Sequence, residues 1–329
     1  ISDISSDGKE TVYIATDGNG VHFLSHKKQQ VTRRFYHDVS DKEGIRSNSV
    51  YSLLVDDRGA VWVGHFQAGL DYSLYQNGLF RTYAYPPLFN SANLSIRSFI
   101  SRGQEKVIGS RDGLFYINEA TGMVKSFVKP VLTSDLILTI SFYQGEYYIG
   151  TYGGGMMVLN PETLSLKYFS QSDTELFQKG HIFCVKPDTK GNLWIGTSQG
   201  LFNYNGQTKQ IKHFTSANSQ LPEGNVYEVS FDSTGKGWIA TETGMCIYDP
   251  ASQNLRSNVF PEGFVNKDKV RTIYEDSEHN LYFIREKGSL FTSTLTMDRF
   301  YNQSVFSTLP DNSLMAIVED NQGWLWVGC

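Results

Sequence analysis

Hydrophobic and polar residues alternate in short blocks along the whole chain, and one block recurs at an average interval of about 45 residues. Each block has an alternating segment, a polar turn and an apolar segment that ends in a small residue, usually glycine. Alternation with a period of two predicts β-strands, and since no segment keeps a period of 3.6 residues, we predict no helix. The clearest copies begin at Val50, Ile182, Val226 and Leu314, and weaker copies begin at Ile1, Ile96, Ile137 and Val270.

Each repeat has room for four short antiparallel strands, which is typical of one blade of a β-propeller. A single four-stranded sheet leaves two apolar faces in water, and stacking it between neighbouring sheets buries both faces. We therefore predict an all-β fold, a seven-bladed β-propeller over residues 1–313. Residues 314–329 are predicted to form the first two strands of a further or shared blade. The blades should begin near residues 1, 50, 96, 137, 182, 226 and 270.

Two positions of the repeat are predicted to be structural. A large aromatic residue stands two positions before the small residue in most copies, and we expect it to pack between blades. The turn D-x-x-G precedes it, for example at Asp188–Gly191, and the aspartate should hydrogen-bond its own turn. A calcium loop would need further oxygen ligands and a following glutamate, which are absent. The aromatic positions are Tyr13, Trp62, Tyr148, Trp194, Trp238, Tyr282 and Trp326.

The pattern D-x-x-G-x-L-W-[IV]-G-T-x-x-G-L resembles the two-component regulator propeller repeat. It is carried by residues 188–201, residues 56–70 and, in shorter form, residues 319–328. The resemblance implies the periplasmic sensor region of a hybrid histidine kinase, best known from gut Bacteroidetes. Sensors of this family respond to oligosaccharides and activate genes for polysaccharide utilisation. Their kinase, transmembrane and regulator segments are not in this chain, so we expect it to be one propeller of a longer sensor.

The same resemblance implies the partners and the location of the chain. We expect a small carbohydrate ligand, a neighbouring propeller and immunoglobulin-like domain of the parent protein, and a homodimer as a further arrangement. The formal net charge of −5 argues against nucleic-acid binding, which favours a basic surface. No apolar run reaches the roughly 20 residues that cross a bilayer, so we expect no membrane contact by this segment.

No cofactor or metal is predicted from the sequence. The three cysteines are scattered and form no C-x-x-C pair, so neither a disulfide framework nor a zinc site is expected. Cys184 and Cys246 should be small buried residues. The histidines show no metal-binding spacing, and no nucleophile elbow or phosphate-binding loop is present.

The ligand site is expected on the loops that join the second and third strands of each blade, because loop residues are free of packing. Phe66 and Tyr152 could stack on a sugar, while Arg111 and Arg285 could hold an acidic group. Segments that lead into each blade could add Arg46, Asn48, Arg97, His181, Asn225 and Arg271. The predicted ligand-binding residues are His65, Phe66, Arg111, Asp112, Tyr152, Gln199, Glu242, Arg285 and Lys287.

Three classes of function stay open at this point. The first is a ligand-sensing propeller without catalytic residues, which the resemblance favours. The second is a scaffold for protein–protein interaction. The third is a propeller glycosidase or lyase, for which paired carboxylates would have to lie close together, and sequence spacing does not test this.

Overall fold

The computed structural model describes the chain in two compact units. Unit 1 comprises Ile1–Val128 and Met315–Cys329, and unit 2 comprises Lys129–Leu314. The fold is all-β, and its seven four-stranded antiparallel sheets are the blades of a β-propeller, which confirms the predicted fold class. The description excludes residues 39–43, 57–58, 75–79, 83–94, 170–175, 258–268, 286–289, 297–299, 303–313, 315, 321–322 and 329.

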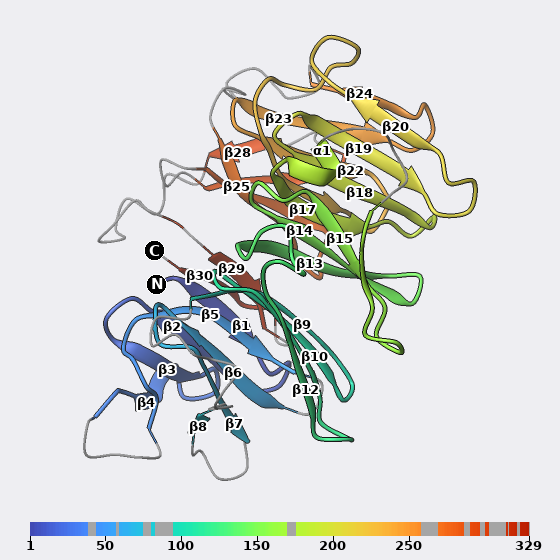
Figure 1. The fold of residues 1–329 in the computed structure, drawn as a ribbon. Helices are drawn as coiled ribbons and strands as arrows, with labels where there is room; N and C mark the ends of the chain where they lie inside the picture. Colours follow the sequence, from blue (N-terminus) through green and yellow to red (C-terminus); the bar gives the residue numbers. More distant parts are fainter. Residues whose placement is uncertain are drawn as a thin grey trace. The chain divides into compact units, whose positions relative to one another are not determined.

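Unit 1 contains three blades and a two-stranded sheet, which we call the terminal hairpin (Figure 1). Within each blade, sequential strands are neighbours and pair antiparallel. The strands are, for blade 1, β1 (Asp3–Ser6), β2 (Thr11–Thr16), β3 (Gly20–Ser25) and β4 (Gln30–Phe35); for blade 2, β5 (Val50–Val55), β6 (Ala60–His65), β7 (Leu70–Leu74) and β8 (Phe80–Thr82); for blade 3, β9 (Ile96–Arg102), β10 (Glu105–Ser110), β11 (Leu114–Asn118) and β12 (Met123–Phe127); and for the terminal hairpin, β29 (Ala316–Glu319) and β30 (Leu325–Gly328).

Unit 2 contains four blades of the same topology (Figure 1). Its strands are, for blade 4, β13 (Ile137–Tyr143), β14 (Glu146–Thr151), β15 (Met156–Leu159) and β16 (Leu166–Tyr168); for blade 5, β17 (Ile182–Pro187), β18 (Asn192–Thr197), β19 (Gly200–Asn205) and β20 (Ile211–Phe214); for blade 6, β21 (Val226–Phe231), β22 (Gly237–Thr241), β23 (Gly244–Asp249) and β24 (Asn254–Arg256); and for blade 7, β25 (Val270–Glu275), β26 (Asn280–Arg285), β27 (Leu290–Thr294) and β28 (Phe300–Asn302).

The prediction of no helix is wrong at one place, since α1 (Leu176–Lys179) forms between blades 4 and 5. A helix of four residues has a single turn, so it leaves no periodic pattern in the sequence. Its buried Phe177 lies with its ring centroid 5.2 Å from Phe169 and 5.1 Å from Phe202. Tertiary packing therefore holds this turn, because so short a helix is not stable alone.

The terminal hairpin packs on the first strand of the chain. Both β29 and β30 contact β1, so the last and first strands of the chain lie side by side within unit 1 (Figure 1). His26 Nδ1 lies 2.9 Å from Asp320 Oδ2, and the His26 ring meets the edge of Trp324 at 5.4 Å. The hairpin therefore covers a face of blade 1 in the way that blade 1 covers a face of blade 2.

An aspartate closes the turn between the first two strands of most blades. In blade 5, Asp188 Oδ1 accepts hydrogen bonds from the backbone amides of Lys190 and Asn192, which confirms the predicted role of this residue. Its second oxygen, Oδ2, accepts a hydrogen bond from Trp194 Nε1 at 3.0 Å, a contact the sequence did not predict. The same pairing recurs in Asp56–Trp62, Asp232–Trp238, Asp276–Tyr282 and Asp320–Trp326.

The aromatic partners of these aspartates pack between blades, as predicted. The Trp194 ring lies 4.4 Å from Tyr248 and 5.9 Å from Phe231, both in blade 6. Trp238 of blade 6 lies 5.4 Å from Phe283 of blade 7. Cys184 and Cys246 are buried free thiols in the same core, which confirms their predicted burial, and desolvation raises the pKa of both.

The first strand of each of blades 2–7 carries one unpaired residue near its start. In blade 5, Ile182 pairs with Thr197 and Cys184 pairs with Gly196, so Phe183 has no residue opposite it. Such a β-bulge re-aims the side chain of the extra residue, and bulges are common next to functional sites. The residues at this position are Tyr51, Arg97, Leu138, Phe183, Tyr227 and Arg271.

Two enclosed carboxyl groups link the first strands of neighbouring blades. Asp3 pairs with Ala15 and accepts a hydrogen bond from the Leu53 amide of blade 2 at 2.7 Å. Glu228 pairs with the equivalent Ala240, and its carboxyl group is hydrogen-bonded by the Ile273 backbone of blade 7. Desolvation raises the pKa of Asp3 to about 6 and that of Glu228 to about 7, against the opposing effect of these hydrogen bonds.

We expect Glu228→Gln to flatten the dependence of stability on pH. The folded protein holds the Glu228 proton more tightly than the unfolded chain, so this group favours folding most below pH 4.5 and loses its contribution as the pH rises through 7. As the pH rises from 5 to 8, the free energy of unfolding of the variant should increase by roughly 1–3 kcal/mol relative to that of the native protein. Urea unfolding at several pH values measures this gain.

The exposed Glu162 provides the matched control for this experiment. Glu162→Gln makes the same chemical change at an exposed position of blade 4, and the flattened profile is expected from Glu228→Gln alone. A Glu228→Gln profile parallel to that of the native protein would show that Glu228 does not carry the raised pKa.

Candidate functional site

In blades 2–6, the loop after the second strand meets the segment that leads into the first strand, at one end of the blade. A backbone hydrogen bond joins them at one repeated position, for example from the Tyr152 amide to the Leu136 carbonyl at 2.9 Å. This end carries the bulges as well, so we call it the bulge face. The other bonds run from Phe66 to Ser49, from Arg111 to Ser95, from Ser198 to His181 and from Glu242 to Asn225.

In unit 1, the structure places His65 inside blade 2 rather than on a loop. His65 is the last residue of β6 and is fully buried, and its Nε2 lies 2.8 Å from Asp71 Oδ2. Arg46 completes the cluster, with its backbone amide 2.8 Å from Asp71 Oδ2 and its Nε 3.3 Å from Asp71 Oδ1. This ion-paired cluster fixes the lead-in segment to β7, so His65 has a packing role that its loop-like sequence context did not indicate.

The other predicted residues of unit 1 lie on its bulge face. Phe66 stacks on the bulge residue Tyr51 with ring centroids 4.8 Å apart, so one face of Phe66 is already covered. Arg111 and Asp112 are exposed on the loop between β10 and β11. The exposed bulge residue Arg97 belongs to the same blade.

In unit 2, aromatic rings from blades 4, 5 and 6 form a continuous row on the bulge face. Tyr152 is half exposed and stacks on His181 at 4.0 Å. His181 is followed by the bulge residue Phe183 at 6.2 Å, and Phe183 is followed by the bulge residue Tyr227 at 5.0 Å. Lys269 Nζ of blade 7 lies 4.3 Å from the centroid of the Tyr227 ring. We call Tyr152, His181, Phe183 and Tyr227 the ring row.

Of the remaining predicted residues, two lie beside the ring row. Gln199 and Glu242 are exposed on the loops after β18 and β22. Arg285 is buried at the end of β26, where its guanidinium lies 5.0 Å from the Phe291 ring centroid. Burial lowers the pKa of Arg285, and the residue ends a strand instead of lying on the loop where the sequence analysis expected it. Lys287 lies outside the described residues.

Sequence reasoning missed the bulge residues Tyr51, Phe183 and Tyr227 as site candidates. The available signal was the second residue of each repeat, which is aromatic, basic or leucine in every copy from the second to the seventh. Alternation alone assigns this residue to a packed face of the strand, because it does not reveal the extra residue. Because the bulge changes the direction of the side chain, Phe183 and Tyr227 supply two of the four rings of the candidate site.

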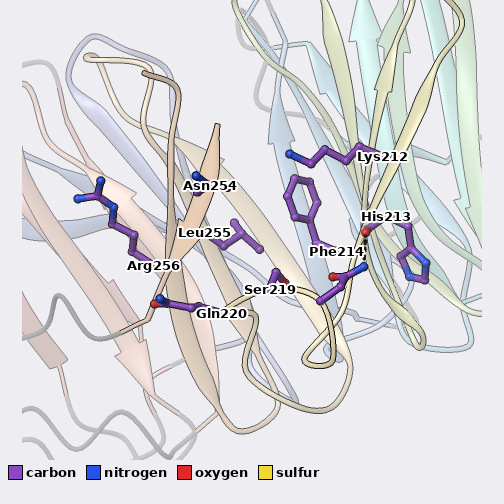
Figure 2. Close-up of a pocket in the computed structure, with 9 residues that line it drawn as sticks. Lys212, His213, Phe214, Ser219, Gln220, Asn254, Leu255 and Arg256 are labelled. Atoms are coloured by element: carbon purple, nitrogen blue, oxygen red, sulfur yellow. Dashed lines mark hydrogen bonds between the residues drawn. The ribbon is translucent and has the colours of Figure 1, made fainter. Parts of the chain in front are cut away.

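A separate hollow of about 440 Å³ lies between β20 and β24, the outer strands of blades 5 and 6 (Figure 2). Phe214 and Leu255 form its apolar floor, while the head groups of His213 and Arg256 point away from it (Figure 2). His213 Nε2 lies at hydrogen-bond distance from Gln199 O, at 2.8 Å, and Arg256 forms an ion pair with Asp249 at 3.5 Å. Among the described residues that line the hollow, Lys212 is therefore the one whose charged group points inward (Figure 2). We assign no ligand to the hollow.

Comparison with known families identifies the repeat. A family model described as "Two component regulator propeller" matches residues 44–67, 177–199 and 308–329. Three segments of the chain therefore match the two-component regulator propeller repeat. The three matched segments overlap the three copies in which the resemblance is clearest, and the resemblance is thereby confirmed. No curated protein matches the sequence at a significant level.

Solved structures share the fold of these propeller repeats. The extracellular domain of BT3049 from B. thetaiotaomicron, described as a hybrid two-component system, has 22% identity and a TM-score of 0.67 over 94% of this chain. PorZ of Porphyromonas gingivalis, a surface component of the type-IX secretion system, has 15% identity and a TM-score of 0.64 over 99%. The computationally designed Ika8 protein has 12% identity and a TM-score of 0.69 over 99% of this chain and 95% of its own.

The chain spans 40% of the BT3049 domain and 52% of PorZ. At these identities the comparisons show a common fold. The helix α1 is one turn long, and no helix in the described parts of the chain has the length and apolar character to span a bilayer.

Proposed function

We propose that this chain is an extracytoplasmic, periplasmic ligand-sensing propeller of a hybrid two-component system and has no catalytic role. The ligand is an oligosaccharide, and its binding signals polysaccharide utilisation. The repeat family supports the sensing role. We assign the ligand site to the ring row, because partly exposed aromatic rings lie there beside polar loop residues. Sugars present C–H faces to aromatic rings and hydroxyl groups to amides and carboxylates.

Sensing requires that the ligand favour one arrangement of the protein over another. A bound oligosaccharide transmits a signal only by its difference in affinity for the two arrangements. The neighbouring propeller and immunoglobulin-like domain of the parent chain, or a second copy of it, provide the contacts that such a change would alter. A scaffold for protein partners is the second candidate, and the aromatic bulge residues of both units are compatible with it.

A thermal-shift screen of the purified chain tests the proposed function. We expect selective stabilisation by one class among neutral and acidic oligosaccharides, by about 2.7 kcal/mol at a hundred times the dissociation constant. Tyr152→Ala should abolish the shift, because Tyr152 is the most exposed ring of the row. Tyr168→Ala is the matched control, since Tyr168 is equally exposed but lies on the outer strand β16.

Arg111→Ala tests separately whether the exposed loop of blade 3 in unit 1 binds an oligosaccharide. If no oligosaccharide stabilises a well-folded protein, the sensing proposal fails and the scaffold becomes the better explanation.

A further inference from the structure

We propose that the ring row binds a neutral, linear oligosaccharide, several of whose units contact successive rings. This inference rests on the proposed function and adds the site, the charge and the minimum size of the ligand. It involves only unit 2, whose blades 4, 5 and 6 supply the four rings.

The size of the ligand follows from the spacing of the rings. The stacked Tyr152–His181 pair forms one aromatic surface, and Phe183 and Tyr227 form two more. Phe183 and Tyr227 are inclined to each other by 56°, so one flat molecule cannot lie on both rings at once. A flexible chain of linked rings can place one unit on each surface. Affinity should therefore increase from a monosaccharide to an oligosaccharide of about three units.

The polar groups beside the rings favour a sugar over a proline-rich peptide, which also binds rows of aromatic residues. His181 Nδ1 is buried and has no hydrogen-bond partner in the described structure. The Tyr152 hydroxyl and the Gln199 side chain likewise make no hydrogen bond among the described residues, although both residues are exposed. A polyhydroxyl ligand can both donate to and accept from the exposed Tyr152 hydroxyl and Gln199 amide, whereas a polyproline backbone offers only carbonyl acceptors.

The charge of the ligand follows from the side chains around the row. Glu242 and Glu223 are exposed on the loops beside Tyr227, and the Glu242 carboxylate lies 3.4 Å from the Asn225 amide. Lys269 is the one cation described in contact with the row, and Arg285 is buried under Phe291. A carboxylate or sulfate on the ligand would meet two like charges and one ammonium, so a neutral ligand is favoured.

Isothermal titration calorimetry on the whole chain tests this inference. The probes are neutral gluco-, manno-, galacto-, xylo- and fructo-oligosaccharides of one to six units, oligogalacturonides of the same lengths, and a proline-rich peptide. We expect one neutral series to bind, with affinity rising up to about three units. Phe183→Ala and Tyr227→Ala should each weaken binding about tenfold, which corresponds to about 1.4 kcal/mol.

Matched variants separate loss of binding from loss of folding. Tyr152→Ala changes an exposed residue and should keep the native circular dichroism spectrum while losing affinity. Tyr168→Ala should keep both. Phe183→Leu retains apolar bulk at the bulge without an aromatic face, so it should fold normally and bind as weakly as Phe183→Ala.

The outcomes distinguish this inference from the proposed function. Two outcomes would overturn the inference and keep the oligosaccharide-sensing function. One is tighter binding of oligogalacturonides than of any neutral series. The other is binding of a neutral oligosaccharide that the Phe183, Tyr227 and Tyr152 variants leave unchanged. Equal affinity for one unit and for four units would overturn the minimum size. Binding of the proline-rich peptide alone, or of no probe, would overturn both.

Discussion

Trp194→Ala is expected to lower the free energy of unfolding by about 3–5 kcal/mol, the range for loss of a buried large aromatic side chain. The indole of Trp194 is almost fully buried and packs on Tyr248 and Phe231 of the next blade. Truncation would therefore open a cavity between blades 5 and 6. Urea unfolding followed by circular dichroism measures the loss.

Trp194→Phe separates packing from hydrogen bonding at the same position. It removes the indole N–H but keeps an aromatic ring, and Asp188 Oδ2 still accepts a hydrogen bond from Asn192 Nδ2 at 2.8 Å. The expected loss is about 1–2 kcal/mol. If Trp194→Ala cost no more than Trp194→Phe, packing between the blades would not be the source of the stability.

Gly155→Ala should lower the free energy of unfolding by about 3 kcal/mol, through two causes that add. Gly155 has a φ of +72°, where an alanine is strained by about 1–2 kcal/mol. A Cβ atom at this position would also meet the Phe177 carbonyl oxygen and the Gln178 amide of α1. Overpacking of this kind costs about 1–3 kcal/mol. Urea unfolding measures the sum.

Gly191→Ala is the control for the conformational part. Gly191 has a φ of +82°, and no heavy atom lies within 4 Å of the position that its Cβ would take. The expected loss is about 1–2 kcal/mol. Equal losses for the two variants would mean that α1 moves freely and does not restrain the loop 151–155.

The repeat predicted the fold well because the same local interactions recur in each copy. The alternation of apolar residues placed the strands, and the aspartate turn placed the hairpins. The hydrogen bond from Trp194 to Asp188 was not predicted, although both residues belong to the repeat, because sequence spacing does not give the direction of a side chain. The helix α1 was missed since packing of Phe177, and not local periodicity, stabilises it.

The candidate site was harder to predict because two of its features depend on the third dimension. His65 and Arg285 occupy the last position of a second strand, where blades 4, 5 and 6 have a buried threonine, and both side chains are buried. The alternating pattern assigns Phe183 and Tyr227 to a packed face of their strands. Each is the unpaired residue of a β-bulge, and the bulge directs its side chain to the candidate site. Tyr152 is exposed, as expected for a residue of the loop after a second strand, and this loop is one residue longer than the equivalent loop of blade 3.

The bond that closes the bulge face in blades 2–6 uses only main-chain atoms. The amides of Tyr152, Ser198 and Glu242 occupy the same place in three blades, although their side chains are an aromatic ring, a hydroxyl group and a carboxylate. Because the bond does not depend on the side chain, this position can change by single substitutions without loss of the loop conformation. The set of side chains on the bulge face can therefore diversify one blade at a time while this main-chain bond is kept.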